Sequence, residues 1–279
     1  MSSRLRGHGF VAYSLAVALW VGGCTPSYHS AQIPSTIQQI CTDEYKMNVT
    51  VKMVGHTLAV HLHHDGILEA IGNRVELADT ANEILGNIIE VIHRVILSSD
   101  AEVRFYLVLA SDPKVPGVAF TLVRYLDDVK RANANMLTPT EFYSRTVFDL
   151  RQVGTVGLSL DQLVPGDIQM EQFLSWQLAK RIQGRLVETM QRRGTAVPEL
   201  QCVGEYQQGE FAFTLGLEPR PGTSATDSDL VQQAFQDAAV VIAQVLSDYR
   251  FEKFDTVRLI HPTTGRSLLL PKTRLELLK

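Results

Sequence analysis

The chain has 279 residues, of which 45% are hydrophobic and 20% charged, and its formal net charge is −4. Three cysteines and 11 prolines are too few for a disulfide-rich miniprotein or a collagen-like chain, and the apolar content is too high for general disorder. Acidic residues outnumber basic ones by 30 to 26, which argues against a nucleic-acid partner, because phosphate backbones attract surplus Lys and Arg.

The first 23 residues have the composition of a targeting segment. A basic head with Arg4 and Arg6 precedes the uncharged run 10–21. That run is shorter than the roughly 20 apolar residues of a membrane span. A basic head, a short apolar middle and small residues at the end are typical of a secretory signal peptide.

Residues 21–24, Val-Gly-Gly-Cys, resemble the lipobox of bacterial lipoproteins. The resemblance covers residues 1–24 only and implies cleavage before Cys24, a diacylglycerol thioether on its sulfur and a further acyl chain on the new amino group. Two or more acyl chains anchor a protein stably to a membrane. Thr25, in place of Asp, goes with the outer membrane in enterobacterial lipoproteins, so we expect the periplasmic face of that membrane. The alternatives are an ordinary signal peptide and a buried apolar helix with an isolated cysteine.

Removal of residues 1–23 leaves 256 residues with 24 basic and 30 acidic side chains, a net charge of −6. A mildly acidic body is not attracted to anionic lipid head groups, so the lipid is expected to make the membrane contact. Residues 24–34 include Pro26 and Pro34 together with serines, and they are expected to form a tether between the lipid and the body.

The first predicted unit, residues 35–131, has the order helix, hairpin, helix, hairpin. Its expected elements are a helix at 35–45, a hairpin at 47–62, a helix at 79–98 and a hairpin at 103–122. Apolar residues alternate on both sides of the turn Gly55-His56, which pairs Val51 with Val60 and places the apolar side chains on one face.

The same order recurs in the second predicted unit, residues 167–279. Its expected elements are a helix at 168–193, a hairpin at 200–217, a helix at 227–247 and a hairpin at 255–270. Residues 56–62 align with 209–215. The sequence therefore predicts an α+β fold of two tandem, related units with antiparallel sheets, and one mixed domain is the alternative. Residues 132–166 connect the units, and a short helix is expected to begin there at Thr138.

His61 and His63 are the candidate metal ligands. They lie two residues apart on one predicted strand and share the face away from the core, an arrangement that can chelate zinc. Neither a His-Glu-x-x-His nor a Cys-x-x-Cys pattern supplies further ligands. The other interpretation is a solvated strand face with two ordinary, neutral histidines.

Cys41 and Cys202 remain after lipidation, in a compartment where a disulfide is chemically allowed. Both occupy core-facing positions of separate predicted units, so buried free thiols are favoured over a bridge. The mixed-charge run 127–131 is expected to be a solvated helical turn.

The sequence contains no nucleophile elbow, phosphate-binding loop or Ser-x-x-Lys motif, and therefore predicts no catalytic residue and no cofactor. The first hypothesis is a non-catalytic, lipid-anchored periplasmic protein whose sheet face or edge binds a partner protein of the envelope. The second is an envelope enzyme or metal-handling lipoprotein that uses His61 and His63. A pocket with both histidines and an acid would favour the second hypothesis, and a bare sheet would favour the first.

Overall fold

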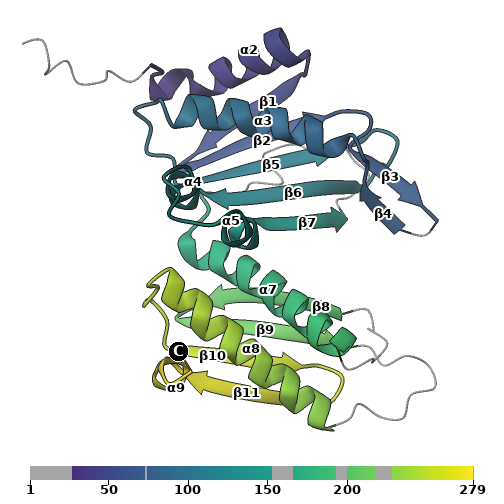
Figure 1. Cartoon of the computed structure of the whole chain (residues 1–279), viewed down its shortest axis with the longest axis vertical. Helices are drawn as coiled ribbons and strands as arrows, with labels where there is room; N and C mark the ends of the chain where they lie inside the picture. The colour runs from purple at the N-terminus through teal and green to yellow at the C-terminus, as the bar shows by residue number, and fades with distance from the viewer. Residues whose placement is uncertain (1–26, 73, 153–165, 193–199, 218–227, 279) are drawn as a thin grey trace, which may run out of the picture.

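The computed structural model describes residues 27–72, 74–152, 166–192, 200–217 and 228–278. Within these ranges the chain has the α+β fold predicted from its sequence. Two larger sheets each carry helices on one face, and a third, two-stranded sheet projects from the first half (Figure 1). The predicted signal peptide and its lipid attachment site, Cys24, lie outside the described residues.

The first sheet has the strand order β1-β2-β5-β6-β7. Its strands are β1 (Val49–Val54), β2 (Thr57–His63), β5 (Phe105–Ser111), β6 (Val118–Tyr125) and β7 (Val147–Gln152). The predicted register of the first hairpin is confirmed, because Val51 pairs with Val60. Gly55 in the turn has a φ of 57°, a conformation that glycine adopts without strain.

The two hairpins of the first sheet meet at a parallel pair. β2 and β5 run in the same direction, and the chain between them forms a small two-stranded arm and then α3 (Ala81–Ile96), whereas a wholly antiparallel sheet was expected. A helix that crosses one face of a sheet carries the chain back to the end where the previous strand began, so the next strand is parallel. The sheet is therefore mixed.

Helices α2 (Ile33–Tyr45) and α3 pack on one face of the first sheet. Alternate residues of the strands face these helices, and Leu58, Val60 and Tyr106 are each 0% exposed. The side chains on the buried stripe of α3 match the predicted amphipathic pattern: they include Leu85, Ile88, Val91, Ile92 and Val95. Burial of this shared apolar surface stabilises the first half.

The described part of the predicted tether, residues 27–34, belongs to the body of the protein: Ile33 and Pro34 begin α2, and residues 27–32 contact the segment after α3. The amide of Ser27 donates to the carbonyl of Ser98 (2.8 Å), and the amide of Ser30 donates to Asp100 Oδ1 (2.6 Å). These bonds hold the chain against the segment that follows α3, so ordered structure begins before α2.

The second half repeats the order helix, hairpin, helix, hairpin. Its elements are α7 (Met170–Arg192), β8 (Leu200–Gln207), β9 (Glu210–Leu217), α8 (Ser228–Asp248), β10 (Thr256–His261) and β11 (Arg266–Pro271). The sheet order is β11-β10-β9-β8, and the middle pair, β9 and β10, is again parallel.

Equivalent backbone bonds join the two hairpins of each sheet. The carbonyl of His56 accepts a hydrogen bond from the amide of Phe105 at the start of β5 (3.2 Å). The carbonyl of Gly209 accepts one from the amide of Thr256 at the start of β10 (3.4 Å). The two acceptors, His56 and Gly209, are the residues at which the predicted alignment of 56–62 with 209–215 begins.

The two halves differ in the elements added to the common unit. The first half also contains β3 (Leu68–Ile71), β4 (Arg74–Leu77), α4 (Leu126–Asn133) and α5 (Pro139–Arg145), and the second ends in α9 (Lys272–Glu276). The predicted connecting segment, 132–166, contains α5 and also β7, which pairs with β6 as the fifth strand of the first sheet. In the first half α4 follows β6, and in the second half α9 follows β11. α9 is the last described element, so no described strand of the second half corresponds to β7.

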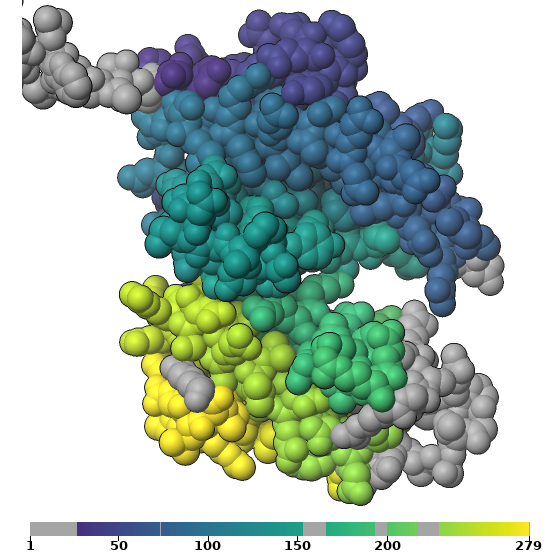
Figure 2. All heavy atoms as spheres, in the orientation of Figure 1, coloured from purple at the N-terminus to yellow at the C-terminus, as the bar shows by residue number. Residues whose placement is uncertain are grey.

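Helix α7 belongs to both halves. On one side it packs against β8 and α8, and on the other it contacts the first sheet (Figure 1). The ring of Phe173 lies 5.2 Å from that of Phe105 and 6.3 Å from that of Tyr125. Lys180 Nζ lies 2.7 Å from Asp149 Oδ1 on β7. The two halves consequently share one apolar core and are stacked in contact at α7 (Figure 2).

Candidate functional site

His61 and His63 meet at one serine hydroxyl. His61 Nε2 and His63 Nδ1 each lie 3.0 Å from the Oγ atom of Ser111, which is 5% exposed on β5. A hydroxyl carries one proton, so it donates to one imidazole and accepts from the other when both rings are neutral. Burial, followed by the charge of His63, lowers the pKa of His61 below its usual value of 6.5, which favours the neutral ring.

The same geometry bears on the predicted metal site. Among the described residues, no third His, Cys, Asp or Glu joins His61 and His63 in a group that could hold a metal ion. Ser111 Oγ already occupies the point at which the two ring nitrogens converge, so a metal would have to displace it. Zinc sites in proteins use three or four protein ligands. Metal binding at His61 and His63 stays a prediction.

The two cysteines of the described body are free and buried, as predicted. Cys41 lies in the core of the first half and Cys202 in the core shared with the second half. Burial raises the pKa of Cys41 to about 11 and that of Cys202 to about 12. Both side chains therefore remain protonated thiols at neutral pH, which makes them poor nucleophiles and poor metal ligands.

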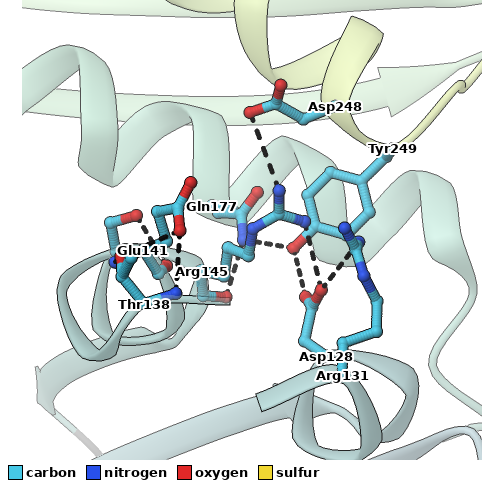
Figure 3. Close-up of polar contacts among 9 residues, drawn as sticks. Asp128, Arg131, Thr138, Glu141, Arg145, Gln177, Asp248 and Tyr249 are labelled. Carbon is cyan, nitrogen blue, oxygen red and sulfur yellow. Dashed lines mark hydrogen bonds and ion pairs between the residues drawn. The ribbon is translucent and has the colours of Figure 1, made fainter. Parts of the chain in front are cut away.

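A buried ion-pair network joins the two halves beside α7 (Figure 3). The run 127–131 was expected to be solvated, and this prediction is wrong for Asp128, which is 2% exposed. Arg145 Nη1 donates to Asp128 Oδ1 (3.1 Å), and the hydroxyl of Tyr249 donates to Asp128 Oδ2 (2.5 Å). Asp128 is on α4 in the first half, whereas Tyr249 follows α8 in the second.

Helices α5 and α7 complete this network. Arg145 is the last residue of α5, a helix whose start is fixed by a capping box between Thr138 and Glu141. On α7, Gln177 Nε2 donates to the carbonyl of Arg145 (2.6 Å) and to the hydroxyl of Tyr249 (2.9 Å). The network, shown in Figure 3, thus ties together α4, α5, α7 and the end of α8.

The protonation states follow from burial and from the partners. Burial raises the pKa of Asp128, while the bond from Tyr249 and the charge of Arg145 act in the opposite direction. Burial and the nearby carboxylate raise the pKa of Tyr249, so its hydroxyl keeps the proton that it donates. The pair of Asp128 and Arg145 lies within the first half, and the bonds from Tyr249 and Gln177 connect it to the second half. Removal of one member of a buried ion pair costs about 3–5 kcal/mol.

Each sheet has one face that points away from the helices of its own half, α2 and α3 or α7 and α8, and this face is here called its back face. The back faces of the two sheets differ in exposure. On the first sheet, Leu107, Leu109 and Val123 are at most 5% exposed. On the second sheet, Val203 is 56% exposed and Leu269 is 50% exposed. The side chains of the second back face, here called the open face, include Val203, Thr214, Ile260, Ser267 and Leu269.

One end of the second back face carries an ion pair. Arg258 Nε lies 2.8 Å from Glu210 Oε1, and the bond from Arg258 holds the pKa of Glu210 below its usual range. Thr256 Oγ1 donates to the same carboxylate (3.2 Å). The open face therefore combines separate apolar side chains, among them Val203 and Leu269, with polar ones and with this paired charge.

A cavity of about 200 Å³ lies between the end of α8 and α9. Its floor is apolar and includes Leu246, Phe254 and Leu275, with Arg250 and Lys272 at its edge. Neither His61 nor His63 lines this cavity, so it does not combine the two histidines with an acid as the enzyme hypothesis requires.

Comparison with known proteins finds no matching protein family, no similar curated protein and no similar solved structure. Across the described ranges, the helices are too short or too polar to span a lipid bilayer.

Proposed function

We propose that this protein is a non-catalytic, lipid-anchored protein of the bacterial envelope that binds a partner protein through its second sheet. The contrast between the two back faces supports this proposal most strongly. The same position is buried in the first half, at Val123, and half exposed in the second, at Leu269. Apolar side chains that are exposed at positions which the first half covers support an interaction surface on this face.

The proposed anchor is the lipidated Cys24, which the lipobox-like residues 21–24 support. The bonds from residues 27–32 to the segment after α3 would then leave only a short span between the lipid and the body. The first half would lie nearest the membrane, and the second half would extend away from it towards a partner.

Labelling with a radioactive fatty acid tests the anchor. The full chain should incorporate the label in a bacterial host and fractionate with membranes, while Cys24→Ser should lose both properties because the thioether cannot form. Cys41→Ser is the matched control and should behave like the unchanged chain. Equal labelling of the Cys24→Ser variant and the unchanged chain would contradict the proposed anchor.

Crosslinking in intact cells tests the binding surface. The substitution Val203→Glu adds a charge to the open face and should reduce crosslinked partner about tenfold or more, since a charge facing an apolar contact costs over 1.4 kcal/mol. Val240→Glu is the control, because Val240 is 50% exposed on α8, away from the open face. Equal crosslinking by both variants would contradict binding through this face.

A further inference from the structure

The outer edge of β11 is the place where the second sheet is incomplete. In the first sheet, β6 pairs with β5 on one side and with β7 on the other. β11 occupies the position of β6 in the second sheet, and of the strands that the structure describes only β10 pairs with it. A sheet edge of this kind presents a row of N–H and C=O groups to which another strand can bond.

The bonding pattern shows which groups point outward from β11. The amide of Lys272 donates to the carbonyl of Asp255 (3.0 Å), which makes Pro271–Thr256 a non-hydrogen-bonded pair of the antiparallel ladder. Because such pairs alternate, the amides of Ser267 and Leu269 point away from β10.

The first sheet has the same pattern with its outer side occupied. The amide of Leu126 donates to the carbonyl of Arg104 (2.8 Å), so the amides of Thr121 and Val123 point outward from β5. These two residues pair with Asp149 and Val147 of β7. When β6 is matched with β11 through the register of each sheet, Thr121 occupies the position of Ser267 and Val123 occupies the position of Leu269.

The middle of β11 lacks the features that protect free edges. Residues 267–270, Ser-Leu-Leu-Leu, contain neither a charge nor a proline, and the charge and the proline of β11 lie at its two ends, at Arg266 and Pro271. By contrast, the outer strand of the first sheet, β1, has Lys52 in its middle, and the carbonyl of Val49 accepts a bond from Gln38 Nε2 (3.2 Å). Natural proteins block exposed edges with charges, prolines or covering segments, so an unblocked apolar edge is suited to a partner strand.

We propose that β11 binds an extended segment of a different protein, which adds to the second sheet as an antiparallel fifth strand. The inference rests on the proposed binding function and names its partner's conformation and direction. The strand should carry an apolar residue opposite Leu269, as Val147 lies opposite Val123, and a polar residue opposite Ser267. Main-chain bonds supply affinity, and the alternating side chains supply specificity.

The first half indicates why the partner is a different protein. There the chain continues from β7 to α7, which contacts the back face of the first sheet through Phe173 and Lys180. A strand that fills the edge and continues into an amphipathic helix would cover both β11 and the open face. A second copy paired through its own β11 would cover the edge alone, because β11 leads into the five-residue α9.

Photo-crosslinking in the native envelope tests the proposal with the full, lipidated chain. A photoreactive residue is placed at Ser267 in one variant and at Leu269 in another, and the crosslinked site on the partner is mapped by mass spectrometry. Antiparallel addition predicts that the contact moves about two residues towards the partner's N-terminus between the first and second variants. A shift towards the C-terminus, a crosslink to a second copy or no common segment would overturn the proposal.

A substitution separates strand addition from other contacts. Leu269→Pro removes an outward N–H and should lower the crosslink from position 267 about tenfold or more, whereas Leu269→Thr keeps the N–H and should retain it. Equal crosslinking in the two variants overturns the proposal. If Leu269→Pro fails to fold, the direction of the mapped contacts still decides.

A further photoreactive residue at Val203 distinguishes this inference from the proposed function. Crosslinks from position 203 without any from position 267 would overturn strand addition and leave binding through the open face in place. No partner crosslink from either position would contradict both.

Discussion

In the first half, a strand and a helix from farther along the chain complete the sheet; in the second half, no described segment covers the corresponding edge or back face. β7 pairs with β6, and α7 packs against the back face, whereas β11 and Leu269 have no such cover from the described residues. Within the described residues, the first half is thus completed by segments that follow it in the chain, and the second half presents at Leu269 and β11 what the first half buries at Val123 and β6.

The largest expected effect is on the junction between the halves. Asp128→Ala should lower the free energy of unfolding by about 3–5 kcal/mol, because it leaves Arg145 buried without its nearest carboxylate. Urea denaturation measures the change, and Asp127→Ala, at an exposed neighbouring site, is the control. Equal stability of the two variants would show that the buried pair of Asp128 and Arg145 does not stabilise the fold.

The contrast between the back faces predicts a difference between two leucines. Leu109→Ala, at a position 3% exposed, should cost about 2–5 kcal/mol through lost burial and a cavity. Leu269→Ala, at a position 50% exposed, should change stability by about 0.5 kcal/mol or less. Thermal and urea unfolding of the purified body measure both values. Similar losses at the two sites would mean that the second back face is buried like the first.

A pH effect distinguishes the first core from the second. His93 Nε2 lies 2.9 Å from the hydroxyl of Tyr106, and burial, with the charge of Arg124, lowers the pKa of His93 from 6.5 to about 4. The unfolded chain binds this proton at about pH 6.5 and the folded chain at about pH 4. Stability from this group is therefore present above pH 6.5 and is lost as the pH falls to 4, by up to about 3 kcal/mol.

Unfolding measured across this pH range tests the assignment. His93→Gln should flatten the acid loss, because the variant has no group at this position that takes up a proton between pH 6.5 and 4. In the second half, Val257 stands at the position of Tyr106, so the histidine–tyrosine hydrogen bond has no equivalent at that position. An unchanged slope in His93→Gln would assign the loss to other groups.

The smallest expected effect concerns zinc. Because His61 and His63 are both bonded to Ser111, the mature protein should release no more heat with zinc than the His61→Ala/His63→Ala variant. Isothermal titration measures the difference. Tight binding that disappears in the variant would favour the metal-handling hypothesis and would require Ser111 to move aside.

Local pattern was enough to predict most of the elements. The alternation around Gly55-His56 predicted the register of the first hairpin, and the apolar stripe of 168–193 predicted the long helix α7. The arm β3–β4 was missed, although Leu68, Ala70 and Val75 alternate around Gly72 in the manner of a hairpin. The local sequence of this arm is thus sufficient to predict a hairpin, and no contact with a distant segment is needed to explain it.

Contacts between distant segments could not be predicted from the sequence. Asp128 lies beside charged neighbours in a short helix, and its burial depends on Arg145 and Tyr249, which are 17 and 121 residues away. The parallel pairing of β2 with β5 likewise depends on where α3 returns the chain. No linear motif encodes either arrangement, because each is selected by packing across the whole fold.

Amide hydrogen exchange in the purified mature protein tests the central contrast most directly. NMR should find the amides of Thr121 and Val123 protected, because they bond to β7, and the amides of Ser267 and Leu269 exchanging about a hundredfold faster or more. Comparable protection at all four amides would contradict the account, since it would show that the edge of β11 is already covered.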